Sequence, residues 1–137
     1  MSSAAEPPVG APPEPLVTGP LTITDFVRYQ GASGDLNPLH HDAEAARAAG
    51  FSSPISVGMF QAGLLASYAV GWLGSEQIRR FRVRFHEPVF PGDVLTCAGE
   101  PDPEPSETAP GIVAVRLRCT RQTGGLAAEA WVSFAVD

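Results

Sequence analysis

The sequence contains no lysine: all nine basic residues are arginines, and fifteen acidic residues outnumber them, which gives a formal net charge of −6. Without lysine, Schiff-base chemistry on a side-chain amine is excluded. The acidic balance also argues against nucleic-acid binding through bulk charge. Positive surface is therefore expected only where arginines gather.

Cysteine is scarce as well, with Cys97 and Cys119 as the two examples. They stand in alternating apolar segments without CxxC spacing, so reduced core thiols are favoured over a disulfide. A long apolar run is also missing, because the longest one includes Gln61, Ser67 and Tyr68. No basic and apolar leader opens the chain. We therefore expect a soluble, cytoplasmic protein without membrane contact.

Length and a hydrophobic content of 44% fit a single compact domain. Residues 1–16 are rich in proline, alanine and glutamate and show no periodicity, which predicts a disordered tail. The single domain is therefore expected to span residues 17–137.

Two short helices are predicted in the first third of the domain. The first is capped by Thr24 and ends near Gly31 or Gly34. The second covers residues 43–49, with Asp42 as its N-cap.

The main helix is predicted over residues 57–73. It is apolar nearly all round and interrupted by small residues, so we expect other elements to enclose it.

Strands are predicted after this helix. Residues 80–85 alternate strictly, with Phe81, Val83 and Phe85 on the apolar face, and three further segments follow at residues 94–99, 112–122 and 126–136. With turn signals at residues 91–93 and 123–125, this order predicts an antiparallel meander, and residues 16–21 are a candidate edge strand. Residues 100–111 are expected to form a mobile loop. The pattern predicts an α+β protein in which a curved sheet wraps one helix, which is the hot-dog fold.

The segment from Ser33 to His40 places a carboxylate, Asp35, and an imidazole, His40, five residues apart across Pro38. Proline fixes its own φ and restricts the residue before it, so this turn is expected to be stiff. Taken alone, Asp35 also fits an N-cap or an Asx turn. The neighbouring His41 fits a solvated residue. A metal site built from these residues and Asp42 is disfavoured, because adjacent histidines point apart.

This motif resembles that of the MaoC-like (R)-specific enoyl-CoA hydratases and 3-hydroxyacyl-thioester dehydratases. The resemblance covers about residues 17–137 and is carried by residues 32–40 with Asp42 and Ala46, by residues 55–65, by residues 82–90 and by residues 91–93. It implies a lyase that interconverts a trans-2-enoyl thioester and the (R)-3-hydroxyacyl thioester without a cofactor or a metal. It also implies an acyl-CoA or acyl-carrier-protein substrate, and a homodimer or a heterodimer with another hot-dog subunit.

The resemblance also assigns roles to residues. Asp35 and His40 fall on the catalytic dyad, Asn37 and Ser33 are expected to support the loop, and Gly58 matches the glycine whose amide binds the thioester carbonyl. One position departs from the family, because Val57 stands where many relatives have histidine directly before that glycine.

These residues fit the implied chemistry. An ordinary aspartate is ionised and an ordinary histidine mostly neutral at neutral pH, so Asp35 and His40 present two acceptors for one water. The N–H groups at the start of the central helix lie at the positive end of its dipole, where they can stabilise a thioester oxyanion.

Arg80, Arg82 and Arg84 share one face of a strand. They fit contacts with the phosphates of coenzyme A or with an acidic carrier protein, and a solvated strand face fits equally well. His86 fits a strand-end residue. The departure at Val57 also leaves open a non-catalytic or half-site subunit of a heteromeric dehydratase, or a module that binds acyl thioesters. Thioesterase activity on the same fold has no positive support in the sequence.

Overall fold

The computed structural model describes residues 9–106 and 109–136. Its helices are α1 (Ile23–Ser33), α2 (Ala43–Ala48) and α3 (Gly58–Leu73), with 3₁₀ turns at Pro38–His40 and Ser75–Gln77. Its strands are β1 (Leu16–Thr18), β2 (Ile78–Phe85), β3 (Leu95–Pro101), β4 (Ile112–Arg121) and β5 (Leu126–Ala135). The predicted α+β class is confirmed.

The strands form one antiparallel sheet in the order β1-β3-β4-β5-β2. Strands β3 to β5 form the predicted meander, and β1 is an edge strand as expected. The predicted neighbours β2 and β3 are not paired, because β2 pairs with β5 and places Val83 opposite Ala130. The segment with the 91–93 turn therefore crosses the end of the sheet.

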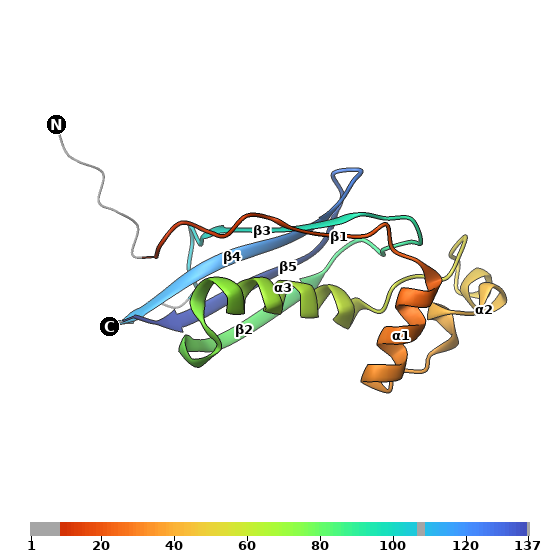
Figure 1. The fold of residues 1–137 in the computed structure, drawn as a ribbon, viewed down its shortest axis with the longest axis horizontal. Helices are drawn as coiled ribbons and strands as arrows, with labels where there is room; N and C mark the ends of the chain where they lie inside the picture. Colours follow the sequence, from red (N-terminus) through yellow and green to blue (C-terminus); the bar gives the residue numbers. More distant parts are fainter. Residues whose placement is uncertain (1–8, 107–108, 137) are drawn as a thin grey trace.

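Helix α3 lies along one face of this sheet, which gives the predicted hot-dog arrangement, while α1 and α2 lie beyond its N-terminal end (Figure 1). Its inner side is fully buried at Leu65 and Ala69, but Met59 and Val70 on the other side are 56% and 44% exposed. The expectation that α3 is enclosed all round is therefore wrong for the single chain. The sheet supplies cover on one side of the helix.

Close packing of α3 on β3 depends on Gly99. A Cβ atom at this position would lie 2.9 Å from the Trp72 ring and 3.0 Å from the Tyr68 ring. Because neither distance leaves room for a side chain, glycine lets the helix approach the strand.

Helix α1 begins earlier than the sequence suggested. Thr22, and not Thr24, is the N-cap: its Oγ1 accepts a hydrogen bond from Asp25 N at 3.1 Å, and Asp25 Oδ2 accepts one from Thr22 N at 2.8 Å. This reciprocal pair is a capping box, and it places Thr24 inside the first turn. The helix ends at Gly34, whose φ of 79° is the left-handed conformation that glycine adopts without penalty. Asp42 caps α2 as predicted.

Residues 9–16 do not fit the predicted disordered tail. Tyr68 Oη donates to Pro13 O at 2.8 Å, and Trp72 Nε1 donates to Gly10 O at 3.2 Å. Val9 is buried, and Leu16 already belongs to β1. Two aromatic residues of α3 thus hold a segment that lacks periodicity of its own. Residues 1–8 of the predicted tail lie outside the described residues.

Other sequence-based expectations have mixed outcomes. Cys97 and Cys119 are buried free thiols that face each other across β3 and β4. The predicted loop over residues 100–111 begins later, because β3 continues to Pro101, and residues 107–108 lie outside the described part.

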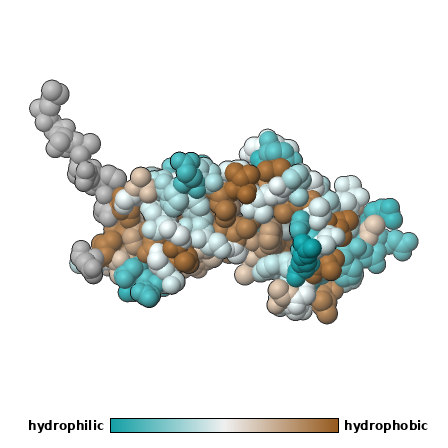
Figure 2. Space-filling view, viewed as in Figure 1, coloured by the Kyte–Doolittle hydropathy of each residue, from teal (hydrophilic) through white to brown (hydrophobic). Residues whose placement is uncertain are grey.

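Within the described residues, no helix has the length and apolar character needed to cross a bilayer. Apolar surface on the viewed face is divided into separate patches by polar residues (Figure 2).

Candidate active site

The loop between α1 and α2 carries the predicted dyad. Asn37 N donates to Asp35 Oδ1 at 3.2 Å, and Leu39 N donates to Asn37 Oδ1 at 3.0 Å. Ser33 Oγ accepts from Asp35 N at 3.3 Å. These short-range bonds form successive Asx and serine turns, in which the side chains of Ser33, Asp35 and Asn37 each accept from a main-chain N–H of the loop. The Asx turn that Asp35 makes also shows that a local structural role accompanies any chemical one.

The two members of the dyad approach each other. Asp35 Oδ2 lies 3.9 Å from His40 Nε2, and the exposed fractions of these side chains are 47% and 10%. This separation is longer than a direct hydrogen bond. It leaves the two atoms close enough for a single water to bridge them.

The tautomer of His40 follows from its other nitrogen. Nδ1 lies 2.8 Å from the carbonyl oxygen of Ile55, and a carbonyl can only accept. In the neutral ring Nδ1 therefore carries the proton, and Nε2 presents its lone pair toward Asp35. Two acceptors then face the same space, which is the arrangement that a water donor would satisfy.

Gln30 is a buried residue of α1 that supports this loop and that the sequence analysis missed. Its Nε2 donates to Asp35 O and Asn37 O, both at 2.9 Å, while its Oε1 lies 2.9 Å from His41 Nδ1. One side chain thus fixes three points of the loop. The signal in the sequence was a polar residue four positions after Phe26, on the buried face of α1.

His40 and Gly58 lie in the same cavity. It is lined by His40, Phe51, Ile55, Ser56, Gly58, Gln61, Phe85, His86, Glu87, Pro88 and Ala127. Gly58 is the first residue of α3, where main-chain N–H groups have no partner within the helix. A Cβ atom on Gly58 would lie 3.3 Å from the Phe85 ring, so glycine keeps this corner open. Phe85 is 47% exposed beside the cavity, although the strand pattern predicted it on the half-buried face.

Two buried polar residues beside Gly58 also escaped the sequence analysis. Ser56 and Gln61 are 4% and 3% exposed, and Ser56 Oγ donates to Gln61 Oε1 at 2.9 Å. The signal was a pair of polar residues at the start of an otherwise apolar helix.

The end of the cavity at His86 is tied to a buried carboxylate. Glu129 Oε1 lies 2.9 Å from His86 Nε2, and Glu129 Oε2 accepts from Arg116 at 2.9 Å. Burial raises the pKa of Glu129, but the hydrogen bonds from Arg116 and His86 outweigh it, so the net direction is downward. His86 follows β2 directly, which confirms its predicted place at the strand end.

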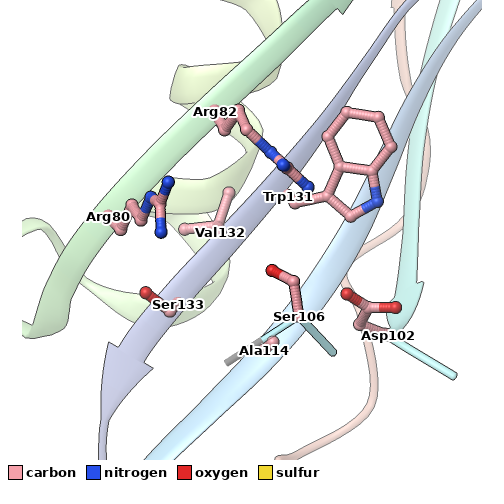
Figure 3. Close-up of a pocket in the computed structure, with 8 residues that line it drawn as sticks. All are labelled: Arg80, Arg82, Asp102, Ser106, Ala114, Trp131, Val132 and Ser133. Atoms are coloured by element: carbon pink, nitrogen blue, oxygen red, sulfur yellow. The ribbon is translucent and has the colours of Figure 1, made fainter. Parts of the chain in front are cut away.

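The predicted arginines lie away from the dyad. Side chains alternate along β2, so Arg80, Arg82 and Arg84 are on the sheet face opposite to Phe81, Val83 and α3. Arg80 and Arg82 line a shallow pocket with Asp102 and Trp131, and Arg82 stacks 4.7 Å from the centre of the Trp131 ring (Figure 3). The structure does not bring this cluster to the His40 cavity, and its binding of a carrier phosphate stays a prediction.

Two other expectations concern His41 and metal binding. His41 is exposed, as expected, but it also contacts Gln30. Among residues 9–106 and 109–136, no three His, Cys, Asp or Glu side chains are grouped as a metal site requires.

Comparisons with known proteins agree with this architecture. The family model of the MaoC like domain matches residues 4–102. The 3-hydroxyacyl-thioester dehydratase Y of Mycobacterium tuberculosis is 41% identical over 68 residues, which are 47% of this chain and 23% of that protein. This chain spans at most 24% of the length of four such curated relatives.

Solved structures extend the likeness to nearly the whole chain. The (R)-hydratase from A. caviae involved in PHA biosynthesis superposes with a TM-score of 0.76 at 25% identity, covering 98% of this chain and 100% of that one. A chain of the ChsH1-ChsH2 complex from Mycobacterium tuberculosis gives a TM-score of 0.77 at 24% identity, with coverage of 94% and 98%, which is a likeness of fold.

Proposed function

The chain belongs to the family of MaoC-like domains, and we propose that it is a hydro-lyase that interconverts trans-2-enoyl and (R)-3-hydroxyacyl thioesters. The observation that carries this proposal is the pair of acceptors, His40 Nε2 and Asp35 Oδ2, held 3.9 Å apart beside the cavity that contains Gly58. An acid-base pair next to unpaired helix N–H groups supplies both requirements of the reaction. The (R) stereochemistry is inferred from the family likeness.

In the hydration direction, a water between the two acceptors loses a proton to the pair as its oxygen bonds to C3. Electrons of the double bond then move toward the thioester, and negative charge develops on the carbonyl oxygen. The Gly58 N–H donates to that oxygen, and a proton returned from the pair to C2 completes the addition. Elimination of water follows the same steps in reverse.

The proton belongs to the pair as a unit. Both groups present an acceptor to the same water, so the roles of base and acid are assigned to the pair and not to either residue. The fixed Nδ1 proton on His40 limits the exchange to Nε2 and the Asp35 carboxylate.

The test is a turnover assay with trans-2-enoyl-CoA substrates of increasing chain length. Loss of the conjugated thioester absorbance and formation of one 3-hydroxyacyl enantiomer, identified by chiral chromatography, are expected. A folded protein in its native assembly that turns over no chain length, on either coenzyme A or carrier protein, contradicts the proposal.

A second candidate is a half-site subunit that needs a different hot-dog chain. It is favoured by Val57, at the position where many relatives have histidine, and by the fold shared with a chain of a two-component complex. The Asp35 and His40 pair argues against a purely structural subunit. A homodimer that turns over enoyl thioesters by itself would exclude this candidate, whereas activity that appears only on adding a second hot-dog chain would establish it.

A further inference from the structure

The start of α3 holds a polar group that the mechanism above does not use. Gln61 is 3% exposed, yet it lines the same cavity as His40 and Gly58. Burial of an amide is costly unless its hydrogen bonds are made, so its partners need to be accounted for.

One end of this amide is satisfied. Ser56 Oγ donates to Gln61 Oε1 at 2.9 Å, which directs the oxygen toward Ser56 and leaves the two N–H groups of Nε2 at the other end. Within residues 9–106 and 109–136, Nε2 donates to no protein atom. In the same residues, no fully enclosed side-chain nitrogen or oxygen lacks a partner. Nε2 is therefore open to the cavity.

The direction of the side chain brings Nε2 toward the first turn of α3. Gln61 is three residues beyond Gly58, and helical side chains lean toward the N-terminus of their helix. Its amide thus returns toward the unpaired N–H of Gly58, on the side of α3 that faces the cavity.

We propose that Gln61 Nε2 is a second hydrogen-bond donor to the thioester carbonyl oxygen, beside the Gly58 N–H, with Ser56 as the residue that positions it. This inference rests on the proposed function and names a further substrate contact for it. The first turn of α3 otherwise offers main-chain donors alone, because its N-cap Val57 is a buried apolar residue. A pair of fixed donors stabilises a developing oxyanion without needing to reorient.

The experiment compares Gln61→Leu and Gln61→Glu with the wild type. Both variants remove the two donors, and the glutamate variant retains the shape of the side chain and an acceptor for Ser56. Gln77→Leu is the matched control, because Gln77 is exposed and lies outside the cavity. Enoyl-CoA turnover gives kcat and KM separately, and infrared spectra of bound saturated acyl-CoA, labelled with ¹³C at the carbonyl, report hydrogen bonding to that oxygen.

We expect kcat to fall about 10²- to 10³-fold in both Gln61 variants, as on loss of one oxyanion donor, with a smaller change in KM. The labelled carbonyl band of acyl-CoA bound to the wild type should lie at a lower frequency than that of free acyl-CoA in water. In both Gln61 variants the frequency of the bound band should rise part of the way back to the value in water. Gln77→Leu should match the wild type in every measurement. Ser56→Ala should lower kcat less than Gln61→Leu, because the donors remain and only their orientation is loosened.

Values of kcat within threefold of the wild type in Gln61→Glu, with an unchanged carbonyl band, overturn the inference, even if Gln61→Leu fails to fold. A wild type that turns over no enoyl thioester overturns the proposed function instead. The infrared result then still tests the Gln61 contact separately from the proposed function. A carbonyl band that differs between the wild type and the Gln61 variants supports the contact, and a band that is the same in all of them excludes it.

Discussion

The two halves of the candidate site are built in opposite ways. The dyad half, residues 33–41, is mostly exposed, and hydrogen bonds between near neighbours shape it. The helix half, which comprises Ser56, Gly58 and Gln61, is largely buried and depends on segments far away in the sequence: Ser56 N donates to Val89 O at 2.8 Å. In the dyad half the Asp35 side chain is thus open to water and only His40 is buried, whereas the groups that hold the carbonyl are set in the scaffold.

The halves meet at the segment before α3. Ile55 accepts a hydrogen bond from His40 Nδ1 at 2.8 Å, and Ile55 N donates to Leu39 O at 3.4 Å. A single residue therefore fixes both the tautomer of His40 and the distance from the loop to the helix start. This arrangement predicts that substitutions in the dyad half impair proton transfer. Substitutions in the helix half should instead change how the thioester carbonyl is held.

The largest effect is expected from the dyad half. Asp35→Asn and His40→Ala should each lower kcat by about 10²- to 10⁴-fold, because a proton acceptor is lost. Thermal unfolding should change little for Asp35→Asn, since its carboxylate is exposed. Steady-state kinetics on an enoyl-CoA substrate measure the loss.

His41→Ala is the matched control for His40→Ala. It removes an adjacent imidazole that contacts Gln30 and does not approach Asp35 in the described structure. A loss in His41→Ala as large as that in His40→Ala would contradict the assignment of the dyad.

The helix half is expected to respond next. Gly58→Ala retains the N–H but adds a Cβ atom 3.3 Å from the Phe85 ring, at the corner where the carbonyl must approach. We expect kcat/KM to fall by roughly 10²-fold, the cost of displacing a substrate by about 1 Å, with KM carrying more of the change than in the dyad variants. Full activity in Gly58→Ala would show that the carbonyl binds elsewhere.

Phe85→Leu in the Gly58→Ala background sharpens this result. The exposed ring is the atom group nearest to the added Cβ, so shortening it should restore part of kcat/KM. Failure of the rescue would attribute the loss to the helix backbone rather than to crowding by Phe85.

A smaller effect is expected from Gln30→Leu, which breaks only the support of the loop. Two loop carbonyls lose their donor, but both belong to exposed residues that water can reach, so a stability loss of about 1 kcal/mol is expected. Turnover should fall about 10-fold, below the cost of a 1 Å displacement. Hydrogen exchange should accelerate in residues 35–41, while the infrared band of a bound labelled carbonyl stays unchanged. A shift of that band would contradict the independence of the two halves.

The sequence predicts the dyad half better than the helix half, for a physical reason. The positions of Asp35, Asn37 and His40 depend on proline restriction and Asx turns, which act over a few residues. The environment of Gly58 depends on Phe85 and Val89, whose approach requires the tertiary fold. The hydrogen-bond network of Gln30 is likewise invisible until α1 is packed against its own loop.

The same distinction applies to the fold. Strand segments and the long helix follow from periodicity, so their predicted ranges are close to those observed. The pairing of β2 with β5 could not be derived this way, because alternation fixes which face a residue occupies but not which strand lies beside it. Residues 9–15 have no periodicity, and their order depends on donors from Tyr68 and Trp72.

The smallest effect on turnover is expected from Asp93→Asn, although its effect on stability should be large. Asp93 lies in the segment that serves both halves: its carbonyl accepts from Leu21 N before α1, and the nearby Val89 carbonyl accepts from Ser56 N. Its buried carboxylate accepts from Arg121 Nε at 2.8 Å and Gln122 Nε2 at 2.7 Å. Asparagine keeps the main-chain contacts but leaves Arg121 without its buried partner, so a loss of about 3 kcal/mol is expected at neutral pH.

The pH dependence of unfolding tests this contribution. Burial raises the pKa of Asp93, but the hydrogen bonds from Arg121, Phe90 N and Gln122 outweigh it and lower the net pKa. A lowered folded-state pKa gives stability that is complete above the unfolded value of about 3.9 and is lost as the pH falls through the folded value. In urea unfolding, the stability gap between the wild type and Asp93→Asn should therefore narrow below about pH 4. A gap that stays constant into that acid range would show that the charge of Asp93 does not hold the two halves together.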